Sequence, residues 1–419
     1  MQEERIIALE AIKKKLVGRA LTYEDSYAVM NQFSKKELGD IFVAYFAAAS
    51  FKEGFTDDEL YFLTKAMVET GKKFDFEGIV ADKHSIGGMP GTRATMIIVP
   101  IIAAAGFLIP KTSSRAITTP AGTADCMEVF APVDIPFDKL RGIVERTGGC
   151  IVWGGHLGIA PADDIIIRVE EPLAFESFDK IMISVLAKKV AASSKLLVLD
   201  IPVGPTMKVK YVKDALAFSE RFVRLARRFD ITVKPEINFQ FEPAGRGIGP
   251  LLEANDALRV LEQTADRPIA LEDKSLKIAS RLLDMCFQKS GRKDDALRVT
   301  EEILRSGKAL KKFKEIIEAQ GGDPSVTSTS IPLAPHKYDV LSTETGTITG
   351  VNNYNITALA KVLGAPVQKK SGMLLRTRYN AKVSKNDILF TLYSEDEGKL
   401  KEALDILPKL PVYEFKKEQ

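Results

Sequence analysis

Two loops of this 419-residue chain concentrate the groups that bind oxyanions. The first, residues 82–95, reads DKHSIGGMPGTRAT and combines a lysine, a histidine, hydroxyl groups and glycines. The second, residues 111–125, reads KTSSRAITTPAGTAD and is rich in hydroxyl side chains. Glycines let backbone N–H groups turn inward, and a helix that begins directly after such a loop presents partial positive charge. Both loops therefore predict a bound phosphate group.

The spacing of the glycines separates these loops from the common nucleotide motifs. The first loop has neither the form G-x-x-x-x-G-K-[ST] nor the form G-x-G-x-x-G, which argues against ATP and NAD as ligands. An ordinary turn is the alternative reading of the first loop. A network of Ser/Thr turns that caps a helix explains one or two hydroxyl groups of the second loop, but not all of them.

Short apolar segments precede these loops, and we expect them to be strands. The candidates are residues 78–81, 106–109, 150–153 and 196–200. Strands that alternate with helices predict a parallel sheet covered on both faces, with ligands bound beyond the carboxyl ends of the strands. The predicted class is α/β: a helical domain, a larger mixed α/β domain with a mostly parallel sheet, and a C-terminal α/β module.

The helical domain is expected at the start of the chain. Thr22, Ser34 and Thr56 each begin the S/T-x-x-D/E pattern of a capping box. Apolar residues at 38, 41, 42, 45 and 46 have helical spacing and predict a packed amphipathic helix. The expected division is a helical domain of residues 1–72 with a return segment of 160–192, an α/β domain of 73–159 and 193–330, and a C-terminal module of 331–419.

Composition narrows the range of partners. The net charge is only +3, with 59 basic and 56 acidic residues interleaved, which predicts no nucleic-acid surface. The three cysteines and three histidines have no paired spacing, so we expect no disulfide framework, no metal site and a reducing cytoplasm. The longest apolar run is broken by Pro100 and Gly106, and the N-terminus lacks a secretory signal. We therefore expect no membrane insertion and no export.

The residues of the two loops resemble those of a known family. The string Ser113-Ser114-Arg115-Ala116-Ile117, then Gly122-Thr123-x-Asp125-x-Met127-Glu128, with Lys83-His84-Ser85-x-Gly87-Gly88 ahead of them, is similar to the thymidine and pyrimidine-nucleoside phosphorylases. Further matches at residues 160–163 and 184–189 extend the resemblance over nearly the whole chain.

Within this superfamily the chain looks more like the archaeal AMP phosphorylase branch. Thr118-Thr119-Pro120-Ala121 stands where pyrimidine enzymes usually have a Gly-His-Thr-Gly run. Ile165-Ile166-Ile167-Arg168 retains an arginine but lacks the tyrosine that helps to hold thymine, and Lys208 stands where a 5′-phosphate could be met. Members of that branch typically carry a further N-terminal domain of several dozen residues, which is absent from this sequence.

The resemblance implies phosphorolysis of nucleoside 5′-monophosphates. AMP, and also CMP or UMP, would react with inorganic phosphate to give the free base and ribose 1,5-bisphosphate. Phosphate is then a co-substrate and no metal or organic cofactor is required. The resemblance also implies a homo-oligomer, at least a dimer. The alternatives are a thymidine or pyrimidine-nucleoside phosphorylase, a magnesium-dependent phosphoribosyltransferase of the anthranilate type, and a phosphate-binding scaffold without activity.

The same resemblance assigns roles to individual residues. The attacking phosphate would be held by Lys83, Ser85, Gly87, Gly88, Thr95, Ser113 and Thr123. The nucleotide would be bound by Gly88, Ser114, Arg115, Ala116, Ile117, Thr118, Thr119, Thr123, Arg168, Ser184, Lys188 and Lys208. Ser184 and Lys188 are four residues apart on a predicted helix and so project from one face.

Two residues are implied to be catalytic. Glu176 would protonate a ring nitrogen of the base, which requires an enclosed site that raises the pKa of the carboxyl group. Ordinary helix-start charge is the alternative reading of Glu176. His84 would orient the phosphate or the sugar hydroxyl groups. Because the phosphate loops belong to the sheet and the base-binding residues to the helical domain, we expect domain closure to exclude water.

Overall fold

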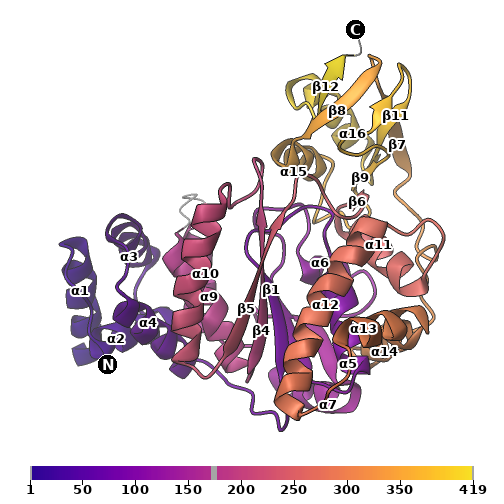
Figure 1. The fold of residues 1–419 in the computed structure, drawn as a ribbon. Helices are drawn as coiled ribbons and strands as arrows, with labels where there is room; N and C mark the ends of the chain where they lie inside the picture. Colours follow the sequence, from indigo (N-terminus) through magenta and orange to yellow (C-terminus); the bar gives the residue numbers. More distant parts are fainter. Residues whose placement is uncertain (1, 171–176, 418–419) are drawn as a thin grey trace.

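The structure is a computed structural model that describes residues 2–170 and 177–417. In Figure 1 the chain forms a helical bundle on the left, a central sheet flanked by helices, and a smaller part at the upper right that holds the C-terminus. The predicted α/β class, with a helical domain, a mostly parallel sheet and a C-terminal α/β module, is confirmed. Across the described ranges no helix is both long enough and apolar enough to cross a membrane.

The bundle combines the first helices of the chain with two later ones. Its members are α1 (Gln2–Leu16), α2 (Tyr23–Ser34), α3 (Asp40–Glu53), α4 (Asp57–Glu69), α8 (Pro161–Glu170) and α9 (Phe178–Ala191). Helix α8 packs against α2 and α3, and α9 packs against α4. Thr22 and Thr56 form capping boxes at the starts of α2 and α4, as predicted. The box predicted at Ser34 is wrong, because Ser34 is the last residue of α2 and α3 begins after Gly39.

Helix α3 buries less apolar surface than its spacing predicts. Leu38 and Phe46 are buried, but Ile41 is 70% exposed, Tyr45 is 53% exposed and Phe42 is 36% exposed. The prediction of a fully packed helix is therefore wrong for these three side chains. Spacing shows only that apolar residues share a face; it does not show what covers that face.

The central strands form one parallel arrangement. They are β1 (Ala81–Ser85), β2 (Ile109–Ser113), β3 (Gly149–Trp153), β4 (Leu196–Val203) and β5 (Thr232–Phe239). Strands β1, β4 and β5 pair in parallel, as do β2 and β3, and a bridge between Val80 and Leu108 joins the two sets. In the resulting order β3-β2-β1-β4-β5, the chain first adds strands on one side of β1 and then, from β4 on, adds them on its other side. Ligands of such sheets bind at this switch point.

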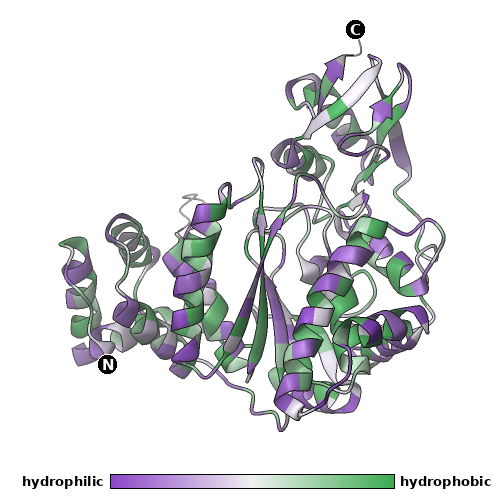
Figure 2. Cartoon of the chain, viewed as in Figure 1, coloured by the Kyte–Doolittle hydropathy of each residue, from purple (hydrophilic) through white to green (hydrophobic). Residues whose placement is uncertain are grey.

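Helices cover both faces of the sheet. They are α5 (Thr95–Ala104), α6 (Thr123–Met127), α7 (Phe137–Thr147), α10 (Val212–Arg227), α11 (Pro250–Glu262), α12 (Ile269–Ser290), α13 (Ala296–Arg305) and α14 (Lys308–Ala319). Alternation along β4 places Leu197 and Leu199 in the core shared with the bundle, and Leu196 and Val198 in the core beneath α5, α11 and α12. Figure 2 shows this apolar interior between the polar outer helix faces.

Strand β5 has no counterpart among the predicted strands. Pro235 lies within it, which is tolerated because β5 is an edge strand. Val233 and Ile237 pack toward the core shared with the bundle, whereas Lys234 and Glu236 form ion pairs with α12. Charged groups on one face and a proline in the middle therefore concealed this strand.

The C-terminal module contains two antiparallel sheets. Its elements are β7 (His336–Leu341), β8 (Gly346–Val351), α15 (Asn353–Val362), β9 (Gly372–Leu375), β10 (Lys382–Val383), β11 (Ile388–Ser394), α16 (Glu397–Ile406), η2 (Leu407–Lys409) and β12 (Tyr413–Lys417). One sheet has the order β10-β8-β12 and the other β6-β9-β11-β7. Strand β6 (Gly247–Ile248) precedes α11 in the chain, so the second sheet ties the module to the central part.

Candidate functional site

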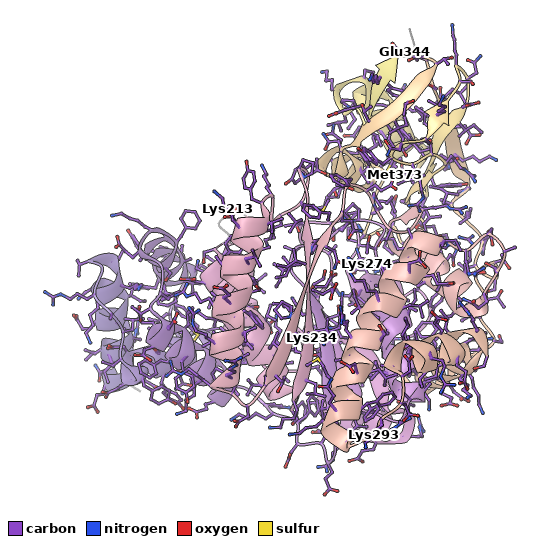
Figure 3. All side chains as sticks on the ribbon, viewed as in Figure 1. Lys213, Lys234, Lys274, Lys293, Glu344 and Met373 are labelled. Carbon is purple, nitrogen blue, oxygen red and sulfur yellow. The ribbon has the colours of Figure 1, made fainter. Side chains whose placement is uncertain are left out.

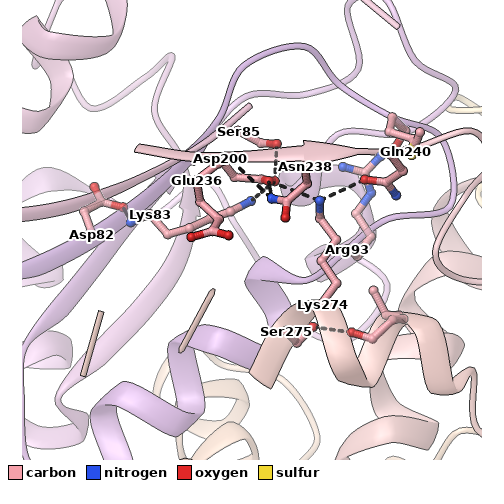
Figure 4. Close-up of polar contacts among 12 residues, drawn as sticks. Asp82, Lys83, Ser85, Arg93, Asp200, Glu236, Asn238, Gln240, Lys274 and Ser275 are labelled. Carbon is pink, nitrogen blue, oxygen red and sulfur yellow. Dashed lines mark hydrogen bonds and ion pairs between the residues drawn. The ribbon is translucent and has the colours of Figure 1, made fainter. Parts of the chain in front are cut away.

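Residues 82–85, predicted as the start of the first loop, belong to β1, and the carboxyl end of this strand lies beside the carboxylate of Asp200 on β4. Ser85 Oγ donates a hydrogen bond to Asp200 Oδ2 at 2.8 Å, and Lys83 Nζ lies 3.8 Å from the same oxygen (Figure 4). Both Lys83 and Asp200 are buried. The two predicted phosphate ligands Lys83 and Ser85 are thus held by one carboxylate, which the sequence analysis missed. The only signal was an acidic residue that follows the apolar run LLVL.

Asp200 also accepts bonds from outside β1. Lys274 Nζ on α12 and Asn238 Nδ2 on β5 each lie 3.1 Å from Asp200 Oδ1 (Figure 4). Figure 3 labels Lys274 on the whole fold. Burial alone would raise the pKa of Asp200, but Lys83 and Lys274 outweigh burial and hold it below its ordinary value. Burial lowers the pKa of Lys83 to about 8. A bound phosphate anion would favour the charged form of this lysine.

The glycine pair lies between two other chain segments. Gly87 has φ +83°, and a Cβ atom placed on it would lie 2.7 Å from Lys208 Cβ. A Cβ atom on Gly88 would lie 2.8 Å from Thr119 Cγ2. Three segments that are far apart in the sequence, with predicted site residues on each, therefore meet at these glycines. Burial lowers the pKa of Lys208 to about 8.

One carboxylate organises the second loop. Asp125 Oδ2 accepts the backbone N–H of Ala116 at 2.6 Å and of Gly122 at 2.8 Å. Arg115 binds Asp125 Oδ1 at 3.2 Å and makes a bidentate ion pair with Glu128 at 2.7 and 2.6 Å. These contacts of the Arg115 guanidinium hold the loop, and its predicted contact with the nucleotide stays a prediction.

The remaining residues of the two loops lie at element ends. Thr95 and Thr123 are the first residues of α5 and α6, where backbone N–H groups lack partners within the helix. Ser113 is the last residue of β2, and Ser114 accepts the N–H of Ala124 through its carbonyl oxygen at 3.3 Å. In the segment that follows, Ile117 and Thr118 are exposed and Thr119 is buried.

On the bundle side, two predicted residues meet at Asp163 of α8. Ser184 Oγ donates to Asp163 Oδ2 at 2.8 Å, and Lys188 Nζ lies 2.6 Å from the same oxygen. The two side chains share one face of α9, as predicted. Arg168 instead pairs with Asp40 of α3 at 2.6 Å and is largely exposed. Glu176, the predicted acid, lies outside the described residues.

A buried charge cluster joins the bundle to the sheet next to His84. Asp82 of β1 forms ion pairs with Lys111 of β2 and with Lys189 of α9, and all three are buried. Burial, together with the positive charges of Lys111 and Lys189, holds the pKa of His84 well below its ordinary value. The imidazole of His84 is therefore neutral and can accept a hydrogen bond at one nitrogen while donating at the other.

Metal ligands are not gathered in the part of the chain that the structure describes. Within residues 2–170 and 177–417, no group of three or more histidine, cysteine, aspartate or glutamate side chains is placed to hold a metal ion. The described loops instead offer lysines, hydroxyl groups and backbone N–H groups. Such donors bind oxyanions rather than cations.

Comparisons with known proteins agree with this arrangement. Residues 9–71 match the helical bundle domain of a glycosyl transferase family, and residues 347–412 match the pyrimidine nucleoside phosphorylase C-terminal domain. The structure is similar to anthranilate phosphoribosyltransferase from Thermus thermophilus, with a TM-score of 0.59 and 18% identity over 74% of this chain and 99% of that chain. At this identity the likeness establishes the fold alone.

Similarity to curated sequences is much higher. The AMP phosphorylase of Thermofilum pendens is 43% identical over 96% of this chain and 77% of its own length. AMP phosphorylase 1 of Archaeoglobus fulgidus is 40% identical over 95% of this chain and 78% of its own length. The AMP phosphorylase of Methanocaldococcus jannaschii is 40% identical over 96% of this chain and 80% of its own length. The chain therefore belongs to the AMP phosphorylase family.

Proposed function

We propose that this protein uses inorganic phosphate to cleave the bond between base and ribose in nucleoside 5′-monophosphates, AMP foremost. The products are the free base and ribose 1,5-bisphosphate. The observation that carries this proposal is the meeting of three loops at Gly87 and Gly88. Lys208 lies against one glycine and Thr119 against the other, while Lys83 and Ser85 stand on β1 directly before the glycines.

The geometry supports two anion sites with different tasks. Lys83, Ser85 and the start of α5 would hold the attacking phosphate, whose charge stabilises the oxocarbenium-like ribose of the transition state. Lys208 would meet the 5′-phosphate of the nucleotide. Because burial holds the pKa values of both lysines near 8, the approach of a phosphate dianion favours their charged forms strongly.

The departing base would lie toward the bundle. Ser184 and Lys188 present a hydroxyl group and an ammonium group on one face of α9, oriented by their shared partner Asp163. Glu176 would protonate the base, a role that rests on the resemblance. His84, neutral and at the end of β1, would orient the phosphate or the sugar hydroxyl groups. No metal or organic cofactor takes part in this proposal.

Closure of the bundle toward the sheet would complete the site. The residues assigned to phosphate lie on the sheet and its loops, and those assigned to the base lie on α9. The ion pair between Lys189 and Asp82 joins these two parts next to the site. Closure would expel water, which would otherwise hydrolyse the nucleotide instead of allowing phosphate to attack.

The alternative of a thymidine or pyrimidine-nucleoside phosphorylase is not favoured. The relatives that are 40–43% identical over nearly the full chain are named AMP phosphorylases. The likeness to a phosphoribosyltransferase concerns the fold alone.

The deciding experiment measures phosphate-dependent release of free base from AMP, CMP, UMP, adenosine, thymidine and uridine, with and without magnesium. We expect turnover of the 5′-monophosphates without magnesium. Turnover of thymidine or uridine alone would contradict the proposal. A strict magnesium requirement would point to the transferase alternative.

We further propose that two copies of the chain associate through the exposed face of α3. Ile41, Phe42 and Tyr45 are exposed there, and such clustered apolar side chains mark contact surfaces. Light scattering coupled to size exclusion should report a dimer, and Ile41→Asp with Tyr45→Asp should yield monomers. A monomeric wild-type protein would refute this part of the proposal.

A further inference from the structure

Helix α15 of the C-terminal module begins against the loop that carries Lys208. Figure 1 shows this helix at the base of the module, facing the central sheet. Asn353 Nδ2, at the start of α15, donates to Thr206 Oγ1 at 2.8 Å and to the carbonyl oxygen of Phe241 at 3.2 Å. Tyr354 OH donates to the carbonyl oxygen of Met207 at 3.2 Å. The helix therefore contacts both residues that directly precede Lys208.

The other end of α15 contacts the second loop. Lys361 Nζ donates to the carbonyl oxygen of Ile117 at 3.0 Å, two residues before Thr119. A few residues further along the chain, Lys369 Nζ lies 2.6 Å from Glu128 Oε2, the carboxylate that also binds Arg115. Both loops that flank the glycine pair are thus bound by polar groups of one small module.

A helix between two loops acts as a spacer of fixed length. Lys361 follows Asn353 by eight positions, which corresponds to ~12 Å along the helix axis at 1.5 Å per residue. The module itself is fixed to the central part, because β6 pairs with β9 and Arg378 binds the carbonyl oxygen of Ala244 at 3.1 Å. Lys208 lies against Gly87 and Thr119 against Gly88, so a change in the spacer would alter the distance between these two side chains.

We propose that α15 positions the two nucleotide-binding loops, with Asn353 and Lys361 as positioning residues that set Lys208 and the Ile117–Thr119 segment for a 5′-monophosphate. This inference rests on the proposed function of the same site and adds a task for the C-terminal module. Asn353 is 3% exposed, so its hydrogen bonds are shielded from water and their loss is not compensated by solvent. Lys361 is exposed, and its removal leaves no buried charge behind.

The test compares variants at the two ends of α15 with matched controls. Asn353→Leu removes the donor to Thr206, and Lys361→Met removes the donor to Ile117, whereas Lys361→Arg keeps a donor. Asn355→Leu is the control for the first variant, because Asn355 Nδ2 donates to the carbonyl oxygen of Pro411 within the module. Lys401→Met on α16 is the control for the second, since Lys401 is an exposed lysine of the same module.

The readouts are the affinity for AMP by calorimetry without phosphate, the KM values for AMP and for phosphate, and the ratio of kcat/KM for AMP to that for adenosine. Each variant loses one hydrogen bond to its nucleotide-binding loop, from Asn353 to Thr206 or from Lys361 to Ile117. A loss of this size predicts an AMP affinity about three- to tenfold weaker. We expect the AMP-to-adenosine ratio to fall and the phosphate KM to stay constant. Lys361→Arg and both controls should resemble the wild-type protein.

The outcomes separate this inference from the proposed function. Unchanged AMP affinity in both Asn353→Leu and Lys361→Met overturns the inference and leaves the proposed function intact. A rise of the phosphate KM equal to that of the AMP KM also overturns it, because general distortion would then be the cause. Wild-type protein that binds AMP without releasing base would refute the proposed function, while the calorimetric comparison would still decide the role of α15.

Discussion

Replacement of Lys208 by methionine tests the proposed function most directly. The substitution keeps an unbranched apolar stem against Gly87 and removes the charge assigned to the 5′-phosphate. A hydrogen bond to a charged group contributes about 1.5–3 kcal/mol, which corresponds to a fall of about ten- to 150-fold in kcat/KM for AMP. Adenosine has no 5′-phosphate, so its kcat/KM should change little.

The same substitution should stabilise the protein at neutral pH. Burial lowers the pKa of Lys208 from 10.5 to about 8, so the unfolded chain binds this proton more tightly than the folded protein does. The charged lysine therefore lowers the free energy of unfolding. This destabilisation is complete below about pH 8 and disappears as the pH rises toward 10.5. At 1.36 kcal/mol per pKa unit the cost is at most about 3 kcal/mol, and partial exposure reduces it.

The assays are steady-state kinetics with both substrates and urea unfolding at several pH values. Lys210→Met serves as the control, because Lys210 lies two residues along the chain and is exposed. We expect Lys208→Met to exceed wild type in free energy of unfolding at pH 7 and the two to converge near pH 10.5. An equal loss of kcat/KM for AMP and adenosine, or a destabilised variant at pH 7, would refute this reasoning.

Two further substitutions test the loops. Asp200→Asn removes the buried charge beside Lys83 and Ser85, so we expect a stability loss of about 3 kcal/mol. The phosphate KM should rise steeply above neutral pH, because Lys83 then loses its proton more easily. A phosphate KM equal to that of the wild-type protein across pH 6–9 would contradict this. Gly122→Ala places a Cβ atom 2.4 Å from the carbonyl oxygen of Ser114, which must shift the backbone. We expect about 1–3 kcal/mol of destabilisation in thermal unfolding, and kinetics should show a loss in kcat/KM that corresponds to a similar free energy. Full activity at an unchanged Tm would show that the loop backbone moves aside without cost.

The chemistry of the two loops could be predicted because it is local. Glycines, hydroxyl groups and a lysine next to a predicted strand end indicate an oxyanion site before any tertiary contact is known. The partners that hold these groups come from elsewhere in the chain. Asp200 reaches Lys83 and Ser85 only because β4 pairs with β1, and no spacing in the sequence reveals that pairing.

Other differences have similar physical causes. The carboxylates of Asp125 and Glu128 meet the guanidinium of Arg115 only once the loop folds back onto α6, and the nucleotide contact of Arg115 stays a prediction. Strand starts were misplaced by three residues at β1 and β2, because the apolar residues before each strand pack as well as those within it. Proline and charges hid β5, where pairing with β4 and packing against α10 outweigh local preference.

The carboxylate of Asp125 determines when the second loop becomes ordered. By accepting the N–H groups of Ala116 and Gly122 it fixes the backbone between them before any substrate arrives. Ordering a flexible residue costs about 1–2 kcal/mol, and here that cost falls on folding rather than on substrate binding. Binding energy thus remains available for the reaction, and the amides of Ala116 and Gly122 should exchange slowly with solvent deuterium even in the free enzyme.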